Sequence, residues 1–146
     1  MEKYKEFAAC NCFKIRRMSR HLSQIYDHAF SVLGIKATQF SILACLSNVD
    51  SVTIVKFSKL IGTERTTLTR NLKILERDGF IKSYYGDDER ERFVELSEKG
   101  FKIIEKAYPL WKSTQDLISE KIGMDINILK SVSDKLLEIS KEDLKL

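Results

Sequence analysis

The sequence predicts a mainly α-helical fold that carries one small β-hairpin. Apolar residues recur at three- and four-residue steps through most of the chain, which is the spacing of amphipathic helices. The spacing changes in residues 80–85 and 93–97, where apolar and polar residues alternate on either side of a charged stretch, as in a hairpin. A tight glycine turn at Gly62 joins two short helices just before these segments. Helix, turn, helix and hairpin together predict a winged helix-turn-helix.

Four helices are expected before the hairpin, over approximately residues 4–33, 38–46, 53–61 and 63–78. The third helix is expected to turn Leu60 and Ile61 inward and to end at Gly62. Thr63 is then in position to cap the fourth helix, since a threonine oxygen can accept a hydrogen bond from the first turn.

Two further helices are expected after the hairpin. The first begins at Ser97, which can cap it, and ends at Gly123. Pro109 should kink this helix or remove one of its hydrogen bonds. The second begins near Asp125, and the residues expected to face inward are Ile126, Leu129, Val132, Leu136 and Ile139. The first and last helices carry more apolar surface than so small a domain can cover, so pairing with a second copy is expected.

Composition limits the classes of function. The chain has 146 residues, is 43% hydrophobic and 32% charged, and matches one ordinary globular domain. A net charge of +4 permits an anionic partner, but any basic patch must be local. No apolar run approaches the ~18 residues of a membrane span, and the first residues do not resemble a secretory signal. Three cysteines without a disulfide framework indicate a cytoplasmic protein.

The fourth helix, TERTTLTRNLKILERDG, separates an apolar face from a face that donates hydrogen bonds. Leu68, Leu72 and Leu75 lie on one side, and the acids Glu76 and Asp78 come only in the last turn. In a helix-turn-helix the second helix enters the DNA major groove with its early residues against the base edges. Arginine pairs with guanine there, and threonine contacts a thymine methyl group or a phosphate. The residues predicted to bind DNA are Arg65, Thr66, Thr67, Thr69, Arg70 and Lys73.

The acid-rich tip of the hairpin, residues 87–92, supplies a second predicted contact. Arg90 at the apex suits a narrow minor groove, which attracts arginine, and Asp88 is expected to orient it through a salt bridge. Arg92 is expected either to touch the DNA backbone or to pin the wing.

Three stretches resemble the MarR (multiple antibiotic resistance regulator) family: LGIKATQFSILACL, LIGTERTTLTRNLKILERDGFIKS and DDERERFVELSEKG. The last is similar to the family's Asp-x-Arg wing followed by Leu-[Thr/Ser]-x-x-Gly, and the matching residues are Asp88, Arg90, Leu96, Ser97 and Gly100. The resemblance covers nearly the whole chain and is most specific from residue 34 to residue 100.

This resemblance implies a single domain over residues 1–146. Residues 34–100 would form the DNA-binding winged part, and residues 1–33 and 101–146 would form the helices of a homodimer. It also implies recognition of a pseudo-palindromic double-stranded operator, usually by a repressor that a small molecule or an oxidant releases. The acid-rich tip departs slightly from the family's pattern.

Cys10 and Cys12 are the one sequence feature that suggests a redox switch. Residues two apart on a helix point about 200° apart, so a disulfide between them requires local unwinding. Such unwinding in a dimer helix would change the spacing of the two DNA-reading helices. The alternative is that both are ordinary small residues on the helix. Cys45 is expected in the core.

Aromatic residues suggest a pocket. Tyr26, Phe30, Tyr108 and Trp111 are candidates to line a site for a small aromatic effector, although aromatics at helical spacing also form plain core. His21 and His28 share a helix face without matching carboxylates or thiolates, so no metal site is expected. Neither a phosphate-binding glycine loop nor a catalytic triad is recognisable, and the sequence predicts no enzyme activity and no cofactor.

The sequence therefore predicts a dimeric, sequence-specific transcriptional regulator that binds double-stranded DNA. The alternative is a winged-helix module that uses the same surface for a protein partner. The donor-rich face of the fourth helix favours DNA. Salt distinguishes the two, because binding through phosphates weakens steeply with salt and an apolar protein contact does not.

Overall fold

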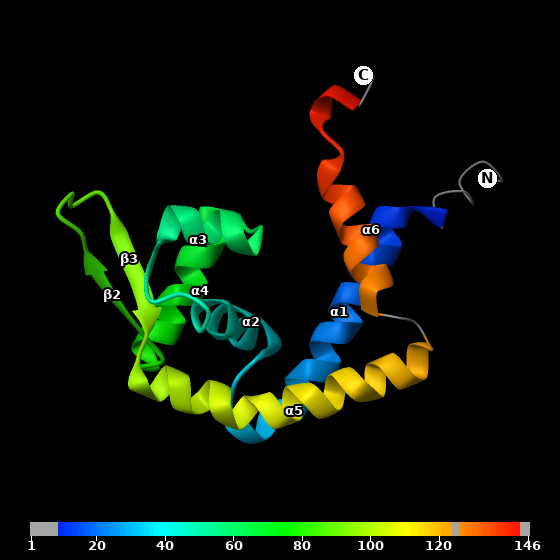
Figure 1. Ribbon diagram of the computed structural model, residues 1–146, viewed down its shortest axis with the longest axis horizontal. Helices are drawn as coiled ribbons and strands as arrows, with labels where there is room; N and C mark the ends of the chain where they lie inside the picture. Colours follow the sequence, from blue (N-terminus) through cyan, green and yellow to red (C-terminus); the bar gives the residue numbers. More distant parts are fainter. Residues whose placement is uncertain (1–8, 124–125, 144–146) are drawn as a thin grey trace. The chain divides into compact units, whose positions relative to one another are not determined.

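A computed structural model describes residues 9–123 and 126–143 of the chain (Figure 1). The elements, in order, are α1 Asn11–Ala29, the 3-10 helix η2 Ser31–Leu33, α2 Ala37–Leu46, β1 Val52–Thr53, α3 Ile54–Ile61, α4 Arg65–Arg77, β2 Ile81–Tyr85, β3 Arg92–Leu96, α5 Glu98–Ile122, α6 Ile126–Glu138 and the 3-10 helix η3 Lys141–Asp143. The chain divides within α5 into two compact units, the first ending at Trp111 and the second beginning at Lys112. The predicted fold class, mainly helical with a small hairpin, is confirmed.

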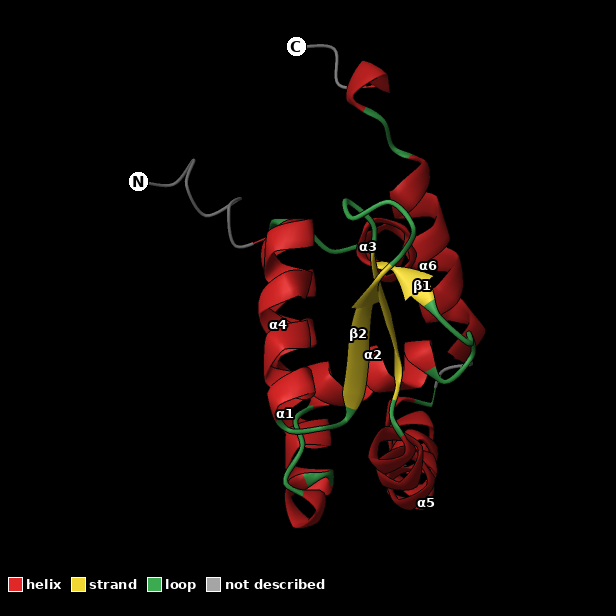
Figure 2. Ribbon diagram, turned by 90° about the vertical axis from the view of Figure 1, so that its left-hand side faces the viewer, coloured by secondary structure: helices red, strands yellow, loops and turns green. Residues whose placement is uncertain are grey.

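The hairpin belongs to a three-stranded antiparallel sheet of order β1-β3-β2, which lies beside α4 (Figure 2). In β2 and β3, Ile81 pairs with Leu96 at the base and Tyr85 with Arg92 near the tip. On its other edge β3 pairs with β1, where Val52 is opposite Val94. The sequence did not predict β1, because two residues are too short to show an alternating pattern.

The core of the winged part, α2 to β3, confirms the predicted inner face of α4. Leu68 and Leu75 are fully buried and Leu72 is nearly so. They pack with apolar side chains of the other elements of this part, so burial holds α4 with its opposite face outward. The other buried members of the cluster are Ile42, Leu43, Leu46, Ile54, Phe57, Ile81, Val94 and Leu96.

The turn between α3 and α4 differs from the predicted turn in the residue that precedes α4. Gly62 ends α3 with φ +71°, as predicted, and the Thr63 amide donates to the Ser58 carbonyl at 3.1 Å. Thr63 therefore closes the end of α3 and does not cap α4. The residue before α4 is Glu64, whose carbonyl accepts from the Leu68 amide at 3.0 Å. Leu60 is 59% exposed, so its predicted inward position is wrong.

Ser97 caps α5 as predicted. Its hydroxyl accepts from the Gly100 amide at 3.0 Å and donates to the Gly79 carbonyl at 2.6 Å, so it also ties α5 to the turn after α4. Pro109 lies inside α5 without ending it, and its ring nitrogen removes one backbone donor. Gly123, at φ +63°, follows the last residue of α5, as predicted.

Several apolar stripes are exposed in the single chain. None of the residues of α1 is buried, and Met18 is 54% exposed. In the second unit, the stripe predicted to face inward is exposed in the single chain, so this prediction is wrong for one copy by itself. These residues are Leu129, Val132, Leu136 and Ile139. The side chain of Ile126 lies outside the described part.

Candidate nucleic-acid interface

The outer face of α4 presents hydrogen-bond donors to solvent. Arg65, Arg70 and Lys73 are exposed, and none of them has an ion-pair partner within residues 9–123 and 126–143. Thr66 and Thr67, in the first turn, are exposed as well. This face therefore carries uncompensated positive charge and hydroxyl groups, which suits phosphates and base edges.

Thr69 differs from the other residues predicted on this face. It is only partly exposed, and its hydroxyl donates to the Arg65 carbonyl at 2.7 Å within the helix. The Thr69 hydroxyl hydrogen is therefore already engaged in a hydrogen bond within the helix. The methyl group and the oxygen lone pairs are what Thr69 can offer to DNA.

The wing tip is shaped by Asp88, but not through the predicted salt bridge. Asp88 Oδ1 accepts from the Arg90 backbone amide at 2.9 Å, and the Asp88 carbonyl accepts from the Glu91 amide at 2.8 Å. No ion pair joins Asp88 to the Arg90 guanidinium in the described residues. The carboxylate thus fixes the turn that carries Arg90 and leaves the arginine side chain exposed.

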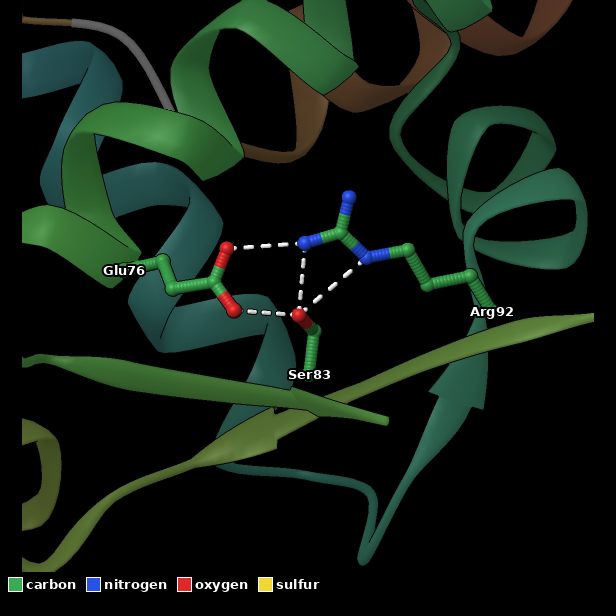
Figure 3. Close-up of polar contacts among 3 residues, drawn as sticks. All are labelled: Glu76, Ser83 and Arg92. Atoms are coloured by element: carbon green, nitrogen blue, oxygen red, sulfur yellow. Dashed lines mark hydrogen bonds and ion pairs between the residues drawn. The ribbon is translucent and has the colours of Figure 1, made fainter. Parts of the chain in front are cut away.

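Arg92 pins the wing, one of the two roles expected of it (Figure 3). Its Nη2 lies 2.8 Å from Glu76 Oε2 in α4 and 2.6 Å from Ser83 Oγ in β2. Ser83 Oγ also donates to Glu76 Oε1. We call Glu76, Ser83 and Arg92 the clamp. The sequence places Glu76 in the last turn of the predicted helix, but nothing in the spacing of these residues reveals the contact.

The start of α5 is packed closely against the chain that follows α4. A Cβ atom at Gly100 would lie 2.1 Å from the Phe80 carbonyl oxygen, so only glycine fits without movement. Next to it, Lys99 Nζ donates to the Asp78 carbonyl at 2.6 Å, at the end of α4, and lies 4.7 Å from the centre of the Phe80 ring. These contacts fix the base of the hairpin relative to α4.

Three exposed lysines extend the positive surface beyond the predicted set. Lys56 and Lys59 lie on α3 and Lys82 on β2, and no ion pair of the described chain engages them. The first helix of a helix-turn-helix crosses the DNA backbone, so lysines on α3 are suited to phosphates. The apolar spacing of α3 predicts only a core element, and the lysines at its polar positions are the sequence signal for this additional surface.

The cysteines differ from the helical arrangement assumed above. Cys10 precedes α1 with ψ 120°, outside the helix, whereas Cys12 lies in the first turn. The opposed directions expected of two helical residues therefore do not apply. Both cysteines are exposed and free. Cys45 is partly buried and packs against the main core, as predicted.

A cavity of about 170 Å³ lies among α1, α2 and the first half of α5. Of the predicted pocket residues, Tyr26, Phe30 and Trp111 line it, together with Ala37, Phe40 and Ser41. Tyr108 does not line the cavity. It is 59% exposed, and its ring centre lies 5.8 Å from that of Trp111. Burial raises the pKa of Tyr26 above its usual value. Asp27 of α1 accepts from the Ala37 amide at 2.7 Å, which joins α1 to α2 beside the cavity.

In the described residues, no three histidine, cysteine or acidic side chains gather where they could hold a metal ion. Within the same residues, no helix combines the length and the apolar character needed to cross a bilayer.

Comparison with known proteins places the chain. The MarR family model matches residues 35–91. The organic hydroperoxide resistance transcriptional regulator of Bacillus subtilis is 30% identical over 128 residues, which cover 87% of this chain and 86% of that protein. The M. tuberculosis transcriptional regulator MosR, solved in complex with DNA, is 36% identical, with a TM-score of 0.83 over 94% of this chain and 99% of its own.

A more distant structure shows the same fold. A mutant MarR from E. coli, solved with operator DNA, has a TM-score of 0.75 at 23% identity, over 92% of this chain and 96% of its own. The matched segment 35–91 holds α4, β2 and the tip loop with Arg90, and it ends just before β3 and Arg92. These relationships favour the transcriptional regulator over the protein-interaction module. The chain belongs to the MarR family of winged helix-turn-helix transcriptional regulators.

Proposed function

We propose that this MarR-family DNA-binding regulator is a homodimeric repressor of a pseudo-palindromic operator. Helix α4 enters the major groove, and Arg90 at the wing tip enters the adjacent minor groove. The observation that carries the proposal is the outer face of α4, where Arg65, Arg70 and Lys73 are exposed without ion-pair partners in the described chain. Fixed cations on a helix shaped to fit the major groove suit DNA better than a protein surface.

The contacts fall into two groups. Arg65, Thr66, Thr67, Thr69, Arg70 and Lys73 form the surface toward the major groove. Lys56, Lys59 and Lys82 are assigned to phosphates, which position the protein without reading sequence. In a dimer on a palindrome, the two copies of α4 lie roughly 34–36 Å apart, one turn of DNA.

The homodimer is proposed to form through the helices that flank the winged part, residues 1–33 and 101–146. In the first unit, Ile15 and Met18 of α1 are exposed. In the second, Leu117, Ile122 and the α6 stripe are exposed. Monomeric proteins rarely leave so many large apolar side chains in water, and a second copy would cover them. Sedimentation equilibrium measures this directly, and a monomer at micromolar concentration would contradict it.

Two routes of release are proposed. The first is oxidation of Cys10 and Cys12. A peroxide takes two electrons from the thiols, which form a disulfide as the peroxide leaves as alcohol and water. The relative named for organic hydroperoxide resistance supports this route. The second is a small aromatic effector in the cavity beside Tyr26 and Trp111. Free thiols fit the proposed cytoplasmic location.

The test is a fluorescence anisotropy titration with fragments of the DNA upstream of the protein's own gene. We expect specific binding that weakens steeply with salt. The titration is repeated after mild peroxide, with a Cys10→Ser/Cys12→Ser variant as control. Loss of binding in the oxidised wild type alone supports the thiol route, and binding that ignores peroxide leaves the cavity route. Absence of specific binding in both states would refute the proposed function.

A further inference from the structure

The inner face of the hairpin changes character between its base and its tip. Cross-strand pairs on this face are Ile81 with Leu96, Ser83 with Val94, and Tyr85 with Arg92. Ile81, Leu96 and Val94 are buried, but Ser83 and Arg92 are partly exposed and Tyr85 is exposed. Apolar packing against the core therefore holds the base of the hairpin. This packing ends before the tip.

The clamp begins where this packing ends. Ser83 and Arg92 are its hairpin members, and Glu76 is its member from the last turn of α4 (Figure 3). Arg92 is the first residue of β3 and pairs with Tyr85, directly after the tip loop, residues 86–91, that carries Arg90. The contact that ties the outer part of the hairpin to α4 is thus polar and lies at the mouth of that loop.

The three side chains satisfy one another. The Ser83 hydroxyl donates to Glu76 Oε1 and accepts from Arg92 Nε at 3.1 Å and Nη2 at 2.6 Å, which uses its one hydrogen and both lone pairs. Glu76 uses one carboxylate oxygen for each partner. Arg92 Nη2 donates to both Glu76 and Ser83, and Nε gives Ser83 a second hydrogen bond. Lysine has one donor nitrogen and no counterpart of Nε, so it is not expected to restore the full set of contacts.

We propose that Arg92 is a positioning residue of the DNA interface and not a DNA contact. Through Ser83 and Glu76 it fixes the direction of the wing relative to α4, so that Arg90 and the donors of α4 reach neighbouring grooves together. The proposal rests on the proposed function. It predicts that Glu76, an acid that phosphates should repel, strengthens DNA binding.

The experiment measures operator affinity and its salt dependence for Glu76→Ala, Arg92→Met and the double variant, each with and without Arg90→Ala. Both single variants should weaken operator binding by about tenfold, as expected when a charged hydrogen bond of ~1.5 kcal/mol is lost. The double variant should be no weaker than either one, because the same contact is lost. Arg90→Ala should weaken operator binding much less in the clamp variants than in the wild type. A general loss of stability would not produce this difference.

Matched controls separate position from charge. Arg77→Met removes a cation from the same turn of α4, where Arg77 pairs, among the residues that the structure describes, only with its neighbour Asp78, at 2.9 Å. Glu105→Ala removes an exposed acid of α5. Neither control variant should change the loss of operator affinity that Arg90→Ala causes. Thermal unfolding verifies that each variant folds, and Ser83→Ala replaces any clamp variant that does not, with the same expected loss.

Three results would overturn the proposal. The first is operator binding by Glu76→Ala that is as tight as in the wild type or tighter, as simple charge repulsion predicts. The second is full recovery in Arg92→Lys of the affinity lost in Arg92→Met, as a direct phosphate contact predicts. The third is an equal loss of affinity on Arg90→Ala in every background. If the wild type binds no operator at all, the proposed function fails and this proposal fails with it.

Discussion

Replacing Gly100 by alanine tests how closely α5 must approach the chain after α4. The new Cβ would lie 2.1 Å from the Phe80 carbonyl oxygen and 2.9 Å from Leu96 Cδ2. Because non-bonded heavy atoms prefer separations of about 3.5 Å, the two segments must move apart by roughly 1.4 Å. The same Phe80 oxygen accepts from the Ser97 amide at 3.0 Å, so the movement also disturbs this hydrogen bond.

The expected cost follows from these two contacts. Overpacking costs about 1–3 kcal/mol, a disturbed buried hydrogen bond costs about as much, and alanine regains about 1 kcal/mol through its helix propensity. We expect Gly100→Ala to lower the free energy of unfolding by about 3 kcal/mol. For a chain of this size, that corresponds to a fall in Tm of about 6–12 °C.

Thermal and urea unfolding followed by far-UV circular dichroism measure the effect. Lys102→Ala is the control, since Lys102 is exposed in the same helix and its loss should change stability by no more than about 0.5 kcal/mol. If Gly100→Ala has the same Tm and the same urea midpoint as the control, the close approach of Phe80 does not restrict this position and the reasoning is refuted.

Four further predictions concern DNA binding and stability. Arg70→Ala should cost about 1–3 kcal/mol on the operator and little on random DNA; an equal loss on both would make Arg70 a phosphate contact. Arg90→Ala should reduce the slope of log K against log salt by about one per wing; an unchanged slope would remove Arg90 from the interface. Ser97→Ala should lower the free energy of unfolding by about 1–2 kcal/mol, because the Gly100 amide loses its cap; an unchanged urea midpoint would contradict this. Burial raises the pKa of Tyr26, so above a pH of about 10 the unfolded chain loses the phenolic proton before the folded chain does. The free energy of unfolding therefore falls as pH rises. Tyr26→Phe should flatten this decline, and an identical decline in that variant would show that Tyr26 is not its source.

Local patterns predicted the parts of the site that depend on a single element. The spacing of Leu68, Leu72 and Leu75 determined which face of α4 is buried and therefore which face is presented outward. Gly62 and Ser97 marked the end of α3 and the start of α5, because left-handed backbone and capping favour particular residues wherever they occur.

Other features needed the packed structure. Thr63 has the residue type of a helix cap, but α4 begins at Arg65 and Glu64 takes the cap position. Strand β1 exists because Val52 meets Val94, about forty residues later in the chain, and two residues carry no pattern of their own. The direction of Cys10 depends on where α1 begins, which apolar spacing locates only to within a turn.

The sequence by itself determined the order of the main helices and the hairpin, and the composition of the α4 surface, because both follow from the period of apolar residues and from the residue types in one helix. Only the tertiary structure decided what Glu76 and Arg92 do. They are sixteen residues apart and on different elements, and they meet only because the hairpin folds back beside α4. A contact of this kind depends on the position of both backbones, and no local spacing encodes that position.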